Sequence, residues 1–102
     1  MIKADVVLGV LQVRLHLPNS GSLKAKRRVV AGLLQQVRNR FSVAAAEVGD
    51  GNLWQLADLG IACVSNDSRH ADEVLAGVLS FIERRAGEAV IANVRTEVTR
   101  FQ

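Results

Sequence analysis

The sequence predicts an α+β domain in which two amphipathic helices pack on one face of a four-stranded antiparallel sheet. Two observations carry this prediction: apolar residues alternate with polar ones in some segments, and recur every three or four residues in two longer segments. The chain has 102 residues, 49% of them hydrophobic, which is enough for one compact core and too little for two. A single domain over residues 1–102 is therefore expected.

Four strands are expected. In residues 7–17 apolar odd positions alternate with polar even ones from residue 11 onward, the period of a half-buried strand. A short strand over residues 43–48 precedes the turn signal of residues 49–52, Gly-Asp-Gly-Asn, which predicts a hairpin. The returning strand, residues 53–64, ends in an apolar run at 59–64, typical of a central strand covered on both faces. The last strand, residues 90–101, is expected to turn these residues inward: Val90, Ala92, Val94 and Val98.

Two helices are expected, the first over residues 23–41 and the second after the capping segment at residues 65–68. The apolar stripe of the first consists of Leu23, Val30, Leu33, Leu34, Val37 and Phe41. The stripe of the second consists of Ala71, Val74, Leu75, Val78, Phe81 and Ile82. Arg84 and Arg85 suit the last turn of this helix, and Gly87 suits its C-terminal cap.

The element order strand, helix, strand, strand, helix, strand predicts a ferredoxin-like βαββαβ sandwich. In this topology the start of the first helix, the hairpin turn and the end of the second helix share one edge. The sheet face without helices is expected to display Gln12, Arg14 and His16 beside Asn93, Arg95, Glu97 and Thr99. Because residues 59–64 are apolar on both faces and the helices cover only one, self-association is expected.

The start of the first helix is unusually basic. Its first two turns carry Lys24, Lys26, Arg27 and Arg28, although the helix dipole disfavours cations there by roughly 0.3–1 kcal/mol each. Ser22 and the backbone amides of the first turn, with these cations, predict an anion-binding site for phosphate. Helical projection places Lys24 and Arg28 away from the apolar stripe and Lys26 and Arg27 on its shoulders. The same residues also fit an ordinary solvated helix face.

Charge and cysteine content limit the possible classes of protein. With 13 Lys and Arg against 10 Asp and Glu the net charge is +3, so binding to a polyanion must depend on local clustering. A lone Cys63 in an apolar run is expected to be a core residue, excludes an internal disulfide and favours a reducing compartment, so a cytoplasmic location is expected. We expect neither a signal sequence nor a membrane anchor.

Three segments resemble the bacterial YlxP-like family, a domain family of unknown function: the helix start Ser22-Leu23-Lys24-Ala25-Lys26-Arg27-Arg28, the run Leu59-Gly60-Ile61-Ala62, and Val64-Ser65-Asn66-Asp67. The likeness extends over nearly the whole chain. It implies a ferredoxin-like fold. Many family members are encoded beside the translation initiation factor and ribosome-binding factor A, so it also implies a connection with ribosome maturation or translation.

The sequence predicts a non-catalytic accessory protein of RNA or ribosomal particles. No acid/base pair or cysteine pair is recognisable, so no catalytic residue, cofactor or metal site is predicted. The strands lack central aromatic residues, so base stacking is not expected. The candidate anion- and RNA-binding residues are Lys24, Lys26, Arg27, Arg28 and Ser22, with His16 and Arg14 on the open sheet face. The alternative is a homo-oligomeric regulatory or scaffolding module that uses this open face.

Overall fold

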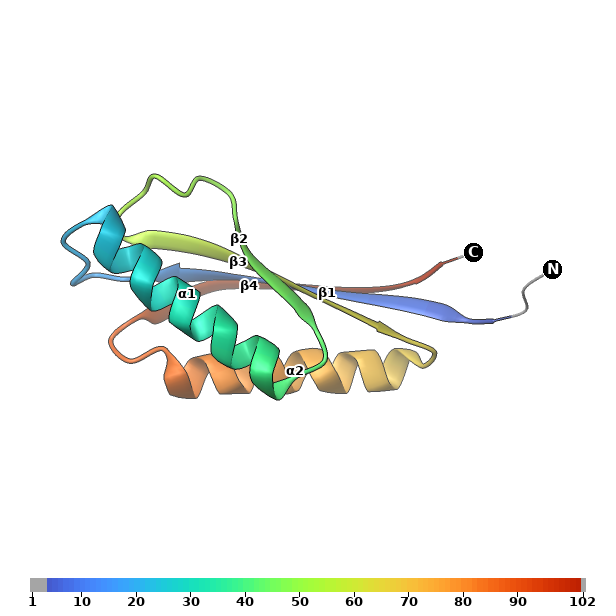
Figure 1. The fold of residues 1–102 in the computed structure, drawn as a ribbon. Helices are drawn as coiled ribbons and strands as arrows, with labels where there is room; N and C mark the ends of the chain where they lie inside the picture. Colours follow the sequence, from blue (N-terminus) through green and yellow to red (C-terminus); the bar gives the residue numbers. More distant parts are fainter. Residues whose placement is uncertain (1–3, 102) are drawn as a thin grey trace.

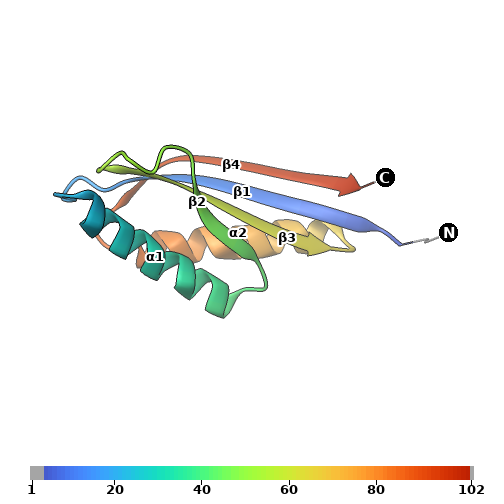
Figure 2. The same cartoon turned by 45° about the horizontal axis from the view of Figure 1, so that its top comes forward.

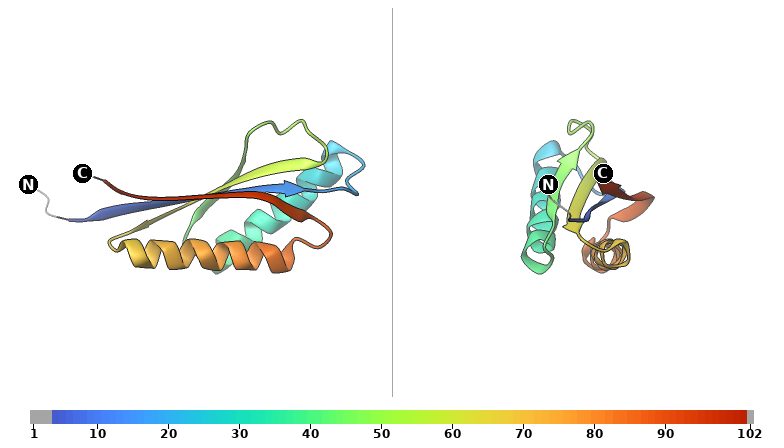
Figure 3. Two further views of the ribbon diagram at one scale, coloured as in Figure 1. Left: turned by 180° about the vertical axis from the view of Figure 1, so that it is seen from behind. Right: turned by 90° about the vertical axis from the view of Figure 1, so that its right-hand side faces the viewer.

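The computed structural model describes residues 4–101. These form, in order, β1 (Val6–His16), α1 (Leu23–Arg40), β2 (Ala44–Val48), β3 (Leu56–Ser65), α2 (Ser68–Arg85) and β4 (Val90–Phe101) (Figure 1). The four strands form one antiparallel sheet in the order β2-β3-β1-β4. Both helices lie on the same face of this sheet (Figures 2 and 3). The predicted ferredoxin-like βαββαβ fold is confirmed; residues 1–3 and 102 of the predicted domain lie outside the described range.

The core lies between the helices and one face of the sheet. Along β1 every second residue from Val7 to Leu15 is buried and those between are exposed, as the alternation predicts. Gly9 takes one of the buried positions because a Cβ there would lie 3.0 Å from both Cys63 Sγ and Leu75 Cδ1. The absence of a side chain at residue 9 therefore lets α2 pack closely on the sheet. Cys63 is buried in this core, as predicted.

The hairpin between β2 and β3 is confirmed, but its loop is longer than the predicted turn. Pairing of β2 ends at Val48, opposite Asp58, and β3 begins only at Leu56 instead of residue 53. The backbone leaves β2 through Gly49 at a φ of 76°, which favours glycine. Leu53 and Trp54 are exposed in the loop. Residues 53–55 pair with no residue of β2, so they belong to the loop and do not extend β3.

Strand β4 contains an irregularity that the sequence does not reveal. Its register against β1 shifts between Arg14 and Leu15, so that Ile91 lies opposite Leu15 and Val90 opposite His16. The shift turns Val90 to the open face, where it is 56% exposed. The prediction that Val90 faces inward is therefore wrong, since strict alternation does not survive a β-bulge. Asn93 and Arg95 share the open face with Arg14 and Gln12, as predicted, and lie directly opposite them.

Three loops meet at the edge where α1 begins, as the topology predicts. The amide of Leu17 donates to the carbonyl oxygen of Gln55 at 2.8 Å, which joins the end of β1 to the hairpin loop. The side chain of Gln55 donates to the carbonyl oxygen of Pro18 at 3.1 Å. Asn19 donates to Glu88 at 2.6 Å and so reaches the loop before β4. The lead-in to α1 is thus held by both neighbouring loops.

The second face of the sheet has no cover within the described chain. On β3 the residues that face the helices are buried, while Val64 is 73% exposed. The prediction that the apolar run at residues 59–64 is covered on both faces is not met by this chain alone. Within residues 4–101, the open face is therefore left exposed to solvent.

Candidate functional site

The seven predicted site residues fall into three separate environments. Lys24, Arg27 and Arg28 lie exposed on α1, and Lys26 is completely buried. Arg14 and His16 occupy even positions of β1 and lie on the open face, across the sheet from α1. The candidate residues are therefore divided between α1 with its N-cap Ser22, on one side of the sheet, and Arg14 and His16 on the other.

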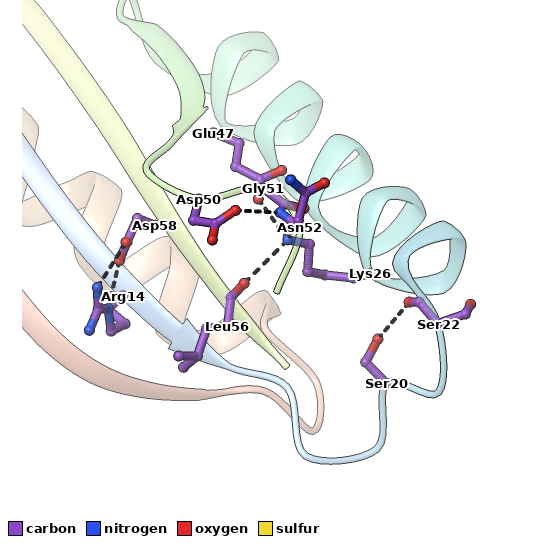
Figure 4. Close-up of polar contacts among 10 residues, drawn as sticks. All are labelled: Arg14, Ser20, Ser22, Lys26, Glu47, Asp50, Gly51, Asn52, Leu56 and Asp58. Carbon is purple, nitrogen blue, oxygen red and sulfur yellow. Dashed lines mark hydrogen bonds and ion pairs between the residues drawn. The ribbon is translucent and has the colours of Figure 1, made fainter. Parts of the chain in front are cut away.

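Ser22 is the N-cap of α1. It has an extended backbone, with φ of −164° and ψ of 161°, and its hydroxyl oxygen accepts a hydrogen bond from the amide of Ala25 at 3.1 Å. Ser20 donates from its hydroxyl to the carbonyl oxygen of Ser22 at 3.2 Å (Figure 4). One of the free amides of the first turn is thus capped by the chain itself, and the first turn contains no acidic residue.

Lys26 turns inward, contrary to its predicted place in a surface anion site. Its side chain is 0% exposed. The ammonium group donates to Glu47 Oε2 at 3.0 Å, to the carbonyl oxygen of Gly51 at 2.9 Å and to the carbonyl oxygen of Leu56 at 3.3 Å (Figure 4). Since an ammonium group has three donors, its hydrogen-bonding capacity is filled. Lys26 fixes α1 to the hairpin loop and presents no charge to a surface ligand.

The helical spacing contains a signal for this buried position. The apolar stripe of α1 has a gap between Leu23 and Val30, and position 26 falls three residues after one and four before the other. The partner has a signal as well, because Glu47 pairs with the buried Leu59 and therefore faces the helices. The gap is readable from sequence alone, but the direction of Glu47 depends on the register of β2.

Arg14 also forms an ion pair, with a carboxylate that was not predicted from the sequence to be its partner. Its guanidinium Nε and Nη2 donate to the two carboxylate oxygens of Asp58 at 2.8 and 3.0 Å (Figure 4). Arg14 and Asp58 lie opposite each other on adjacent strands, which makes this bidentate pairing possible. The hydrogen bonds from Arg14 hold the pKa of the Asp58 carboxyl below its ordinary value, and Asp58 raises the pKa of Arg14. Arg14 is therefore not a free cation.

The ion pair between Arg14 and Asp58 predicts a specific pH dependence. A carboxyl whose pKa is lowered by folding stabilises the protein above its unfolded pKa, and the contribution is lost as pH falls through the folded value. We expect Asp58→Asn to lower the free energy of unfolding near neutral pH, and the difference from wild type to shrink below pH 3.8, the ordinary value. Urea denaturation of wild type and Asp58→Asn, near neutral pH and again below pH 3.8, measures this difference in the free energy of unfolding. An equal difference under the two conditions would contradict the stabilising role of the ion pair.

His16 lies at the polar end of the open face. It lines a shallow hollow of about 500 Å³ with Leu53, Trp54, Gln55 and Leu56. Trp54 is 56% exposed in this hollow, on the loop between β2 and β3. The structure thus places His16 beside an aromatic side chain, on the face of the sheet opposite α1. Its predicted contact with RNA stays a prediction.

The exposed face of α1 carries cations near both ends of the helix and no acid. Besides Lys24, Arg27 and Arg28, the exposed residues Arg38 and Arg40 lie in its last turn. The 18 residues of α1 include six Lys and Arg and no Asp or Glu, whereas the rest of the chain has seven Lys and Arg against ten Asp and Glu. No ion pair joins the five exposed cations to a carboxylate of residues 4–101. The positive charge of the protein is therefore concentrated on α1.

Arg38 and Arg40, which were absent from the predicted site, are held in place by contacts without charge neutralisation. Arg38 donates to the carbonyl oxygen of Ala45 at 2.6 Å. The guanidinium group of Arg40 lies 5.6 Å from the ring centre of Phe81, and Arg85 of α2 lies 5.2 Å from the same ring. Arg85 thereby adds a sixth cation beside α1. The lack of acids in residues 23–40 is the sequence signal that identifies this surface.

A metal-binding cluster and a membrane-spanning helix are both absent from residues 4–101. No group of three or more His, Cys, Asp or Glu comes together there to hold a metal ion. Neither described helix combines the length and apolar composition needed to cross a membrane.

The fold and the basic helix define a small ferredoxin-like protein with a cationic α1. The family model "Protein of unknown function (DUF503)" matches residues 8–96, and the chain belongs to this family. It is 35% identical over 77 residues to the uncharacterized protein YlxP of Bacillus subtilis (strain 168), covering 76% of this chain and 84% of that protein. The resemblance to YlxP-like proteins is thereby confirmed.

Solved structures with similar backbones include two designed proteins. The de novo designed protein Foldit4 has a TM-score of 0.56 at 13% identity, covering 95% of this chain and 99% of that one. The de novo designed protein LFR1 1 with ferredoxin fold has a TM-score of 0.43 at 12% identity, covering 98% of this chain and 87% of that one. At such low identity, the likeness to Foldit4 concerns the fold alone.

Proposed function

We propose that this chain is a non-catalytic accessory protein that binds the phosphate backbone of RNA, alone or in ribosomal particles, through the exposed face of α1. The observation that carries the proposal is the concentration of charge on this helix: five exposed cations, no acid, and no ion pair to a carboxylate of residues 4–101. In a protein with a net charge of only +3, such clustering is what polyanion binding requires.

The length and position of α1 suit a phosphate backbone. A helix of 18 residues is about 27 Å long, so cations at both ends can contact phosphates that are several nucleotides apart. Lys24 adds to the positive end of the helix dipole, where two amides of the first turn remain available beyond the one capped by Ser22. Contacts of this kind position a protein on RNA through shape and charge, with little selection for base sequence.

Lys26 has a different part in this proposal from the one expected from sequence. Its ion pair with Glu47 and its bonds to the hairpin loop hold the first turn of α1 against the sheet edge. Lys24, Arg27 and Arg28 then project from a fixed backbone. Buried Lys26 is a positioning residue, and the exposed cations make the contacts.

The proposal is tested by mapping a short RNA hairpin onto the protein with amide NMR spectra, at about 50 mM salt. We expect the resonances that shift to belong to the exposed positions of residues 22–40, with Lys24, Arg27 and Arg28 among the largest. Raising the salt to about 200 mM should reverse most of the shifts, because phosphate contacts release counterions. Shifts confined to the open sheet face, or none at all, would contradict the proposal.

A further inference from the structure

We propose that the open sheet face binds a second copy of this chain, so that the protein is a twofold dimer with its sheets packed together and both α1 helices facing outward. This inference is independent of RNA binding. It starts from the exposed side chains of the face. Its apolar half consists of Val6, Leu8 and Val10 of β1, Val64 of β3 and Phe101 of β4, which are 38%, 38%, 38%, 73% and 75% exposed.

The strand register makes this apolar half continuous. Leu8 lies opposite Val64, and Val6 lies opposite Phe101. Since directly paired residues of a sheet point to the same face, these side chains form one patch. Contiguous exposed apolar patches mark surfaces that bind a partner.

The shape of the face favours a second copy of the same sheet. Beside the large side chains, β2 and β3 present a row of small ones along the open face, at Ala44, Ala46, Gly60 and Ala62, which ends at the pair Val48 and Asp58. A twofold axis across the face sets the large side chains of one copy over the small ones of the other. Packed sheets lie about 10 Å apart, a spacing that requires such interdigitation.

The open face carries equal numbers of paired cations and carboxylates, and two of these charges can also pair with a second copy. Arg14 is paired with Asp58 within the chain. Arg95 and Glu97 lie two residues apart on β4 with 76% and 66% of their side chains exposed, and their contact is long, at 3.9 Å. A twofold partner offers each of them an opposite charge. The face as a whole carries no excess of cations for RNA, which distinguishes it from α1.

The size of the face is sufficient for a dimer. Eleven residues of β1 span about 36 Å and four strands span about 19 Å, which gives roughly 600–700 Å². Stable interfaces bury about 600–1,000 Å² per partner. The helices lie on the opposite side of the sheet, so such a dimer leaves the cations of both α1 helices accessible.

The test is the molar mass in solution, measured by sedimentation equilibrium at about 1 to 100 μM. Wild type is expected at twice 11.0 kDa, and Val64→Lys at 11.0 kDa, with a dissociation constant raised by at least about 100-fold. Val29→Lys makes the same change at a residue that is 49% exposed on α1, across the sheet from the open face, and should remain dimeric. Val10→Lys, on β1, serves as a second interface variant if Val64→Lys fails to melt like wild type.

A monomeric wild type at about 100 μM, or a folded Val64→Lys dimer as tight as wild type, would overturn the inference. RNA binding by monomeric Val64→Lys is a separate readout. If it persists while the dimer is lost, the two surfaces act independently. If the dimer forms and RNA does not bind, the dimer inference stands and the proposed function fails.

Discussion

Replacing Lys26 by methionine is expected to lower the free energy of unfolding by about 2–4 kcal/mol, the largest stability effect among the charged residues of α1. The buried ammonium group donates to Glu47 and to two carbonyl oxygens of the hairpin segment. Methionine fills a similar volume but leaves all three acceptors without this donor. Glu47 keeps 22% of its side chain exposed, so water recovers part of the loss.

Chemical denaturation of a double-mutant cycle measures this contribution. Lys24→Met is the matched control, because Lys24 is exposed on the same turn and its loss should change stability by no more than about 0.5 kcal/mol. Combining Lys26→Met with Glu47→Met should cost less than the sum of the single changes, since no carboxylate is then left unpaired. A loss below about 0.5 kcal/mol for Lys26→Met would show that the buried contacts do not hold the hairpin.

Reversing two exposed charges of α1 should reduce RNA affinity without harming the fold. For the double variant Lys24→Glu, Arg28→Glu we expect binding at about 50 mM salt to weaken roughly 30–100-fold, because two phosphate contacts are lost and two repulsions are added. The apo protein should melt at the same temperature or higher, since carboxylates near a helix start gain about 0.3–1 kcal/mol each. Affinity and stability should therefore move in opposite directions.

A control separates position from net charge. Arg69→Glu makes the same charge change as the single variant Arg28→Glu, but at the start of α2, at the other end of the molecule (Figure 1). It should weaken binding by no more than about threefold, a long-range charge effect screened by salt. Equal losses for Arg69→Glu and Arg28→Glu would mean that only total charge matters. A large drop in melting temperature for the double variant would mean that its cations stabilise the fold.

The fold could be predicted because local patterns agree with it. The alternation in residues 7–17 and the two helical stripes follow directly from which side chains are buried. The errors at strand ends have local causes that cannot be read from the sequence. β3 begins at Leu56 and not at the predicted residue 53, because pairing with neighbouring strands begins there. Val90 faces outward because the register of β4 against β1 shifts between Arg14 and Leu15.

The candidate site was harder to predict because contacts between residues far apart in the sequence decide which of its cations are paired with a carboxylate. Arg14 and Asp58 are 44 residues apart, and Lys26 and Glu47 are 21 apart. Whether each cation is free or paired depends on strand register, which is hard to predict from one sequence. The exposed positions of Lys24 and Arg28 were predicted from helical projection alone, because that depends only on local geometry.

The salt dependence of RNA binding tests the central claim, that α1 holds RNA through its exposed cations, most directly. With three to five contacts, the logarithm of wild-type affinity should fall linearly with the logarithm of salt concentration, with a slope of about −2 to −4.5. In the Lys24→Glu, Arg28→Glu variant the slope should be shallower by about 1.4–1.8, with RNA sequence preference unchanged. Identical slopes for the two proteins, or no wild-type binding at about 50 mM salt, would contradict the account.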